Sequence, residues 1–342
     1  MKRIFLLSCL LLLAAGLLAG CGQDTPPVTT ADVTTTASPA TTTATAPTYA
    51  SVPALVSDLN IISVKKDSYS ELDGVDLSNL PPEAAALYRK LLEDTVTYEV
   101  LYRVGSCRVV AYVSLPADYE THTYPLLIYN RGGNGNFGAN TPAQVGMYTA
   151  MTDCIVIASN YRGTSPGTGN DEFGGADVDD VVFWIDMVKA LGFVDRERVF
   201  MLGESRGGMQ TCLALQRDTK GTVKAAACIG GAYDIANTWR VREDMREMLE
   251  RRIGGTPDTC PEEYARRSAV TFADEIHTPL LIVHSTEDPR SPYSDAVAFT
   301  DALKAAGKSY TFRIREDGQH GITSPDELVS ILAWLTENGK DS

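Results

Sequence analysis

The sequence is poor in the residues that mark several common classes of protein. Its 342 residues include only four histidines, and no Cys-x-x-Cys pair or Cys/His spacing suggests a zinc site. Thirty lysines and arginines stand against 44 aspartates and glutamates, which gives a formal net charge of -14 at pH 7. Such a surface repels phosphate backbones, so a nucleic-acid partner is not expected. We also find no internal repeat.

The first 20 residues have the layout of a secretory signal peptide. Lys2 and Arg3 precede the apolar residues 4–18, and small residues follow. The apolar run is shorter than the roughly 20 residues that span a bilayer comfortably. Residues 18–21, Leu-Ala-Gly-Cys, resemble the bacterial lipobox, in which a peptidase cuts before the cysteine and the thiol receives diacylglycerol. We therefore expect an exported lipoprotein, anchored through Cys21 to the outer face of the bacterial cell membrane. An ordinary cleaved signal or an uncut anchor is the alternative.

Residues 21–52 have the composition of a flexible tether. Thr, Ala, Pro, Ser and Val dominate, and there is too little large apolar surface to offset the entropy of ordering. We assign residues 53–95 to an N-terminal extension with one helix, over 80–94, and residues 96–342 to the domain that carries the chemistry. Four of the five cysteines after Cys21 lie in apolar runs and are interpreted as small buried hydrophobic residues. Their disulfide state is left open; the five are Cys107, Cys154, Cys212, Cys228 and Cys260.

The remaining pattern alternates between strands and helices. A hairpin is predicted at Gly105-Ser106, between strands 95–104 and 107–115. Continuous apolar runs then alternate with helix-like stretches over 178–191, 207–216 and 294–306. The runs are at 125–129, 154–158, 199–202, 225–229, 279–284 and 310–314. Strands that are apolar on both faces predict an α/β fold, with a mostly parallel sheet and helices on both faces. The site is then expected at the carboxyl ends of the strands.

The strongest chemical signal is Gly203-Glu204-Ser205-Arg206-Gly207, a G-x-S-x-G between an apolar strand and a helix. A serine on this tight turn is held at the top of the sheet, and the flanking glycines let strand and helix approach closely. Ser205 is therefore the predicted nucleophile. The alternative is a structural turn serine.

A serine nucleophile needs a base, and the candidates are His122, His277, His284 and His320. His122 and His277 precede strands, and His284 ends a strand, where a packed and hydrogen-bonded histidine is the commoner case. His320 follows the last strand in a loop flanked by glycines. We favour His320 as the base, with His284 as its rival.

The acid that orients the histidine should lie between serine and histidine in the chain and follow a strand. Asp288 follows the strand at 279–284 and precedes a helix. Its alternatives are an ordinary helix cap or turn aspartate, and Glu287 as the acid. For the oxyanion hole we predict the backbone N–H of Arg206 and the glycine-rich loop with Gly132 and Gly133. That loop lacks the spacing of a phosphate-binding loop.

From about residue 115 onward the chain resembles the catalytic domain of the prolyl oligopeptidase family of serine peptidases, which has the α/β-hydrolase fold. The matching stretches are Asn160-Tyr161-Arg162-Gly163-Thr164, residues 174–180, residues 194–208, residues 279–288 and Gly318-Gln319-His320. The resemblance implies hydrolysis through an acyl-enzyme, with Ser205, Asp288 and His320 as triad and no metal or cofactor. It favours a peptidase that cleaves short peptides. A carboxylesterase with the same triad, and a catalytically silent surface-binding protein, are the alternatives.

The chain departs from this family in two respects. Residues 53–95 leave no room for the β-propeller that many relatives carry, so an open site is expected. The oxyanion loop reads Arg131-Gly132-Gly133, where relatives often have His-Gly-Gly or a tyrosine donor. Arg131 is interpreted as an oxyanion donor, as a clamp for an anionic substrate group or as a solvated surface residue. Arg162 and Arg290 are further candidates for substrate binding, with loop bracing and plain surface exposure as their alternatives.

Overall fold

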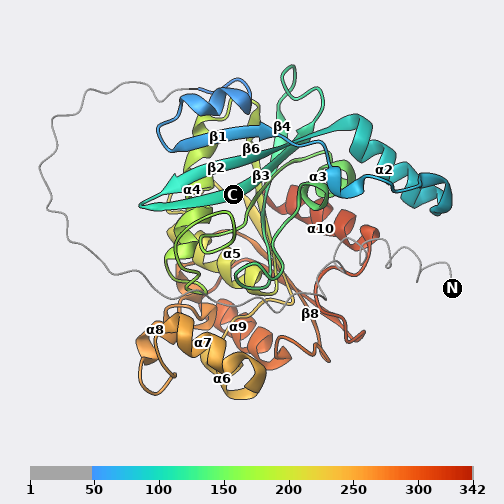
Figure 1. The fold of residues 1–342 in the computed structure, drawn as a ribbon. Helices are drawn as coiled ribbons and strands as arrows, with labels where there is room; N and C mark the ends of the chain where they lie inside the picture. The colour runs from blue at the N-terminus through green and yellow to red at the C-terminus, as the bar shows by residue number, and fades with distance from the viewer. Residues whose placement is uncertain (1–47, 341–342) are drawn as a thin grey trace, which may run out of the picture.

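The computed structural model describes residues 48–340, and a nine-stranded sheet runs through them (Figure 1). Its strand order is β1-β2-β3-β5-β4-β6-β7-β8-β9. The strands are β1 (Ile61–Lys66), β2 (Thr95–Val104), β3 (Cys107–Pro116), β4 (Tyr124–Asn130), β5 (Ile155–Ser159), β6 (Val194–Glu204), β7 (Ala225–Ile229), β8 (Leu280–Ser285) and β9 (Tyr310–Arg315). The α-helices are α2 (Pro82–Asp94), α3 (Pro142–Thr152), α4 (Asp179–Met187), α5 (Arg206–Arg217), α6 (Ile235–Val241), α7 (Arg246–Ile253), α8 (Pro261–Ala265), α9 (Tyr293–Ala305) and α10 (Pro325–Asn338).

The sheet is antiparallel at one end and parallel in the rest. Strands β1, β2, β3 and β5 pair antiparallel in turn, whereas β5, β4, β6, β7, β8 and β9 pair parallel. The α/β fold class is therefore confirmed, and the sheet of residues 48–340 is open rather than closed into a propeller. The predicted signal peptide, Cys21 and most of the tether lie outside the described residues. Within residues 48–340, no helix combines the length and apolarity needed to cross a membrane.

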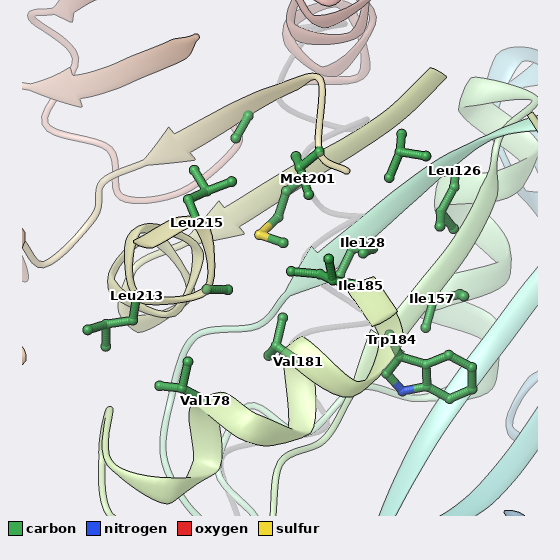
Figure 2. Packing of buried hydrophobic residues seen from close by; sticks show 14 of the residues in the cluster. Leu126, Ile128, Ile157, Val178, Val181, Trp184, Ile185, Met201, Leu213 and Leu215 are labelled. Atoms are coloured by element: carbon green, nitrogen blue, oxygen red, sulfur yellow. The ribbon is translucent and has the colours of Figure 1, made fainter. Parts of the chain in front are cut away.

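The parallel strands are buried on both faces, as their continuous apolar runs predict. Successive residues of a strand point to opposite faces, so Leu126 and Ile128 of β4 join one core, and Leu127 and Tyr129 join another. Helices α4, α5 and α9 pack in the first core, and α3 and α10 in the second. Figure 2 shows Trp184 and its neighbours on α4 facing the sheet in the first core. Both layers therefore hold the strand ends rigidly.

The N-terminal region differs from the prediction. Besides its helix, the extension carries β1, which pairs with β2 and so belongs to the main sheet. Tyr49 and Val52, assigned to the tether, are buried, because an aromatic and a branched side chain can reach the core of the domain. Three of the five cysteines are buried, but Cys107 and Cys260 are only partly so; all five described thiols are free. The predicted burial of Cys107 is thus incomplete.

Candidate active site

The turn that carries Ser205 has a strained backbone. Ser205 has φ 57° and ψ -123°, a conformation that residues with a Cβ rarely adopt. A Cβ on Gly203 would lie 2.1 Å from the carbonyl oxygen of Gly207, and one on Gly207 would lie 1.8 Å from that of Asn130. The chain therefore needs both glycines to pass from β6 into α5. This confirms the interpretation of the flanking glycines and places Ser205 at the carboxyl end of a central strand.

The structure brings His320 and Asp288 together. The Nδ1–H group of His320 donates to the two carboxylate oxygens of Asp288, at 2.8 and 3.0 Å. The Asp288 side chain is fully buried and that of His320 is 16% exposed. Burial alone would raise the pKa of Asp288, but the hydrogen bond and charge of His320 lower it below its usual value. Asp288 therefore stays ionised and fixes the imidazole with Nε2 pointing away from it.

Ser205 and His320 lie around the same two residues at the end of β7. The N–H of Ser205 donates to the carbonyl of Ile229 at 2.9 Å, and a Cβ on Gly230 would lie 3.0 Å from Nδ1 of His320. The Nε2 atom of His320 is buried and has no hydrogen-bond partner among residues 48–340. It is thus the nitrogen left to exchange a proton with a nucleophile; in the absence of substrate this contact is often long.

The rival residues make other contacts, although Nε2 of His284 lies 3.9 Å from Oδ2 of Asp288. His284 is fully buried, and its Nε2–H donates to the carbonyl of Ser291 at 3.0 Å. Burial lowers the pKa of His284, so it is a packed neutral histidine of the core. His122 lies 3.2 Å from the carboxylate of Asp118, and His277 lies 3.3 Å from the ammonium group of Lys308. Both contacts are at the exposed surface. Glu287 is exposed, whereas Asp288 makes the contact with His320.

The glycine-rich loop covers Ser205. A Cβ on Gly132 would lie 3.1 Å from the Cβ of Ser205 and 3.7 Å from its Oγ, so a side chain there would crowd the serine. The carbonyl of Gly133 accepts from Nη1 of Arg206 at 3.1 Å. The loop and the first residue of α5 are therefore joined beside the serine, where backbone N–H groups could meet an oxyanion.

The interpretations of Arg131 as an oxyanion donor, as a clamp for an anionic substrate group and as a solvated surface residue are all wrong. Its side chain is 1% exposed, and each nitrogen of the guanidinium donates within the protein. Its acceptors include the carbonyls of Gly132 at 2.9 Å, Gly135 at 2.8 Å and Asn160 at 2.8 Å. Burial, reinforced by the nearby charge of Arg206, lowers the pKa of Arg131 to about 10. Arg131 therefore holds the oxyanion loop through the loop's carbonyl groups, and it has no donor left for a substrate.

The sequence did not reveal a buried ion network around the side chain of Arg206. This guanidinium, 2% exposed, donates to Asp171 at 2.7 Å and to Asp177 at 2.6 Å. It also lies over the rings of Tyr161 and Phe173, with distances of 5.0 and 4.7 Å to their centroids. The sequence offered one signal of this network: an arginine directly after the nucleophile, with several aspartates in the stretches that resemble the family.

Arg162 and Arg290 have different surroundings. Arg162 binds the buried carboxylate of Asp180 through its backbone N–H and its guanidinium, at 2.7 Å each. It braces a loop, the alternative already considered for it. The exposed Arg290 lies two residues after Asp288 and donates its backbone N–H to that carboxylate at 2.8 Å. Within residues 48–340, no group of three or more His, Cys, Asp or Glu side chains could hold a metal ion.

Comparison with known proteins points to one family. The model of the prolyl oligopeptidase family matches residues 144–341. The uncharacterised peptidase YtmA of Bacillus subtilis is 30% identical over 211 residues, which are 62% of this chain and 80% of that protein. Dipeptidyl-peptidase 5 of Schizosaccharomyces pombe is 25% identical over 308 residues, 82% of this chain and 45% of that protein. The chain thus spans less than half of this second relative.

Solved structures share the fold. Acylaminoacyl peptidase of Pyrococcus horikoshii superposes with a TM-score of 0.62 at 22% identity, over 75% of this chain and 44% of that one. Dipeptidyl peptidase 4 of Porphyromonas gingivalis gives a TM-score of 0.59 at 23% identity, over 74% of this chain and 37% of that one. Both likenesses concern the α/β fold.

Proposed function

The chain belongs to the prolyl oligopeptidase family, and from that premise we propose that this serine hydrolase cleaves short peptides with Ser205, His320 and Asp288 as its triad. The proposal is carried by the hydrogen-bonded pair of His320 and Asp288. The Nε2 atom of His320 has no hydrogen-bond partner among residues 48–340, and His320 and the strained Ser205 both lie against residues 229–230 at the end of β7. The names of the relatives, a peptidase and a dipeptidyl-peptidase, favour peptides over esters.

In the proposed mechanism, Oγ of Ser205 attacks the scissile carbonyl while Nε2 of His320 takes its proton. The N–H of Arg206 and the Gly132-Gly133 loop stabilise the oxyanion. The histidine then gives the proton to the leaving amine, which departs and leaves an acyl-enzyme. Water, deprotonated by His320, attacks the acyl carbonyl; the bond to Oγ of Ser205 then breaks, His320 returns the proton to Oγ, and the acid leaves. Asp288 holds the imidazole and stabilises its charged form throughout.

The test compares matched substrates and variants. N-acyl-dipeptide p-nitroanilides and the corresponding p-nitrophenyl esters share one acyl part and differ in the bond that is broken. We expect turnover of both, and loss of anilide turnover and of fluorophosphonate labelling in Ser205→Ala. Ser309→Ala, which changes an exposed serine, is the control and keeps both. Labelling that survives Ser205→Ala would contradict the nucleophile, and turnover of the esters alone would make the protein an esterase.

We also propose that the protein acts outside the cytoplasm, held to the membrane by lipid on Cys21. The support comes from the sequence of residues 1–21. Full-length protein should fractionate with membranes when expressed in a bacterium, and Cys21→Ala should release it or leave it unprocessed. An unmodified mature N-terminus downstream of Cys21, found by mass spectrometry, would disprove the anchor.

A further inference from the structure

Glu204, the residue before the nucleophile, joins two parts of the site. Its Oε1 accepts hydrogen bonds from the hydroxyls of Tyr129 at 2.9 Å and Tyr148 at 2.8 Å. Its Oε2 accepts from the backbone N–H of Ile322 at 2.9 Å. Ile322 is two residues past His320, so one carboxylate links the serine strand, α3 and the histidine loop.

The histidine loop approaches this carboxylate closely. Gly321 has φ 81°, and a Cβ added there would lie 2.8 Å from Oε2 of Glu204. Three donors converge on Glu204, and the two oxygens of its side chain accept all three hydrogen bonds. The rings of Tyr129 and Tyr148 lie 4.6 Å apart, and burial raises the pKa of both hydroxyls, so they remain donors.

We propose that Glu204 is a positioning residue of the hydrolase: held by Tyr129 and Tyr148, it fixes the loop of His320 at the distance from Ser205 that proton transfer needs. This inference rests on the proposed roles of Ser205 and His320. Because Glu204 and Ser205 are adjacent in the chain, the hydrogen bond between Ile322 and Glu204 connects the loop of the base to the backbone of the nucleophile. A loop displaced by about 1 Å can cost about a hundredfold in rate.

The first test distinguishes the hydrogen bonds of Glu204 from its charge. Glu204→Gln keeps one oxygen for the Ile322 N–H, and its amide group can donate to the tyrosine hydroxyls. We expect it to retain kcat within about threefold. Glu204→Ala removes the acceptor, and kcat should fall about 10- to 100-fold while KM changes less than about threefold, as expected when positioning rather than binding is lost. Active-site titration and circular dichroism report the folded fraction of each variant.

A double-mutant cycle tests whether the tyrosines act through Glu204. Tyr148→Phe alone should lower kcat a few-fold, and it should have no further effect in the Glu204→Ala background. Tyr112→Phe is the matched control, because Tyr112 is also partly buried against the same core. If Glu204→Ala does not fold, Gly321→Ala replaces it, since the new Cβ would push the loop off the carboxylate and lower kcat.

Each outcome decides the matter. Loss of melting temperature with kcat unchanged in Glu204→Ala, or in Gly321→Ala where that variant replaces it, would make Glu204 a purely structural residue and overturn the inference. A Glu204→Gln variant as slow as Glu204→Ala would assign the effect to charge and also overturn it. Additive effects of Glu204→Ala and Tyr148→Phe would show that Tyr148 does not act through Glu204, and would overturn that part of the inference. Activity that survives Ser205→Ala would instead refute the proposed function.

Discussion

The two sides of the site differ in how deeply the residues that hold them are buried. On the oxyanion side, Arg131 and Arg206 are almost fully buried and hold the loop of Gly132 and Gly133 from behind. On the histidine side, the loop is partly exposed, and the side chains that bind its backbone, Arg315 and Glu204, are only partly buried. Arg315 donates to the carbonyls of Gln319 at 2.9 Å and Gly321 at 3.0 Å, and Glu204 accepts from Ile322.

This difference suggests a division between stability and rate. An unpaired buried charge endangers the whole fold, whereas a loosened surface loop changes only the geometry of what it carries. Fixed donors suit an oxyanion hole, because the hole works by being organised before the reaction. Variants on the oxyanion side should therefore change unfolding first, and variants on the histidine side should change kcat first.

The largest effect is expected from Asp288→Asn on the histidine side. The amide keeps the shape of the side chain but favours the wrong tautomer of His320, so kcat should fall about 10²- to 10⁴-fold with the protein still folded. Glu287→Gln is the neighbouring control and should keep kcat. The measurement is kcat on a peptide anilide, beside a urea unfolding curve. Equal losses in both variants would break the assignment of Asp288.

Next comes Arg206→Met on the oxyanion side. It leaves Asp177 buried without its cation and Asp171 with only Arg252, at 3.2 Å, which should cost about 3–5 kcal/mol of unfolding free energy. Arg198→Met is the control, because it breaks a largely exposed pair with Asp195 and should cost at most about 1 kcal/mol. Urea denaturation measures both. A stable Arg206→Met protein with a lower kcat would place this arginine among the groups that set the rate and weaken the comparison.

Acid should loosen the oxyanion side in a defined range. Burial alone would raise the pKa of Asp171, but Arg206 and Arg252 lower it from 3.8 to about 2. The unfolded chain therefore binds this proton first, so the stabilisation is present above about pH 4 and is lost as the pH falls toward 2. It amounts to about 2 kcal/mol. Asp171→Asn should be less stable than wild type at pH 5 and flatter between pH 5 and 3; parallel curves would exclude Asp171 as the cause.

The sequence was most informative where local rules act. The G-x-S-x-G turn, the strand at residues 225–229 and the order of serine, acid and histidine follow from glycine geometry and apolar runs. The edge strand β1 was missed because only Ile61 of its residues is buried, and α3 because its small apolar residues show no helical face. Arg131 was misjudged because burial of a charge depends on carbonyls that the fold gathers around it, here those of residues 135 and 137 in its own loop and of residue 160 after another strand. Such contacts form only after folding.

The smallest effect is expected from Arg290→Ala, at the exposed rim of the histidine side. Its backbone N–H holds Asp288, and that contact survives any change of side chain. The guanidinium lies beyond it at the surface, where it could meet a carbonyl or carboxylate of a substrate. We expect KM to rise about three- to tenfold with kcat and stability unchanged, the pattern of lost substrate binding. Arg198→Ala, an arginine in a surface ion pair, should leave KM unaltered. A fall in kcat at constant KM would instead show that the Arg290 side chain helps to position Asp288, which would make it a positioning residue rather than a substrate-binding one.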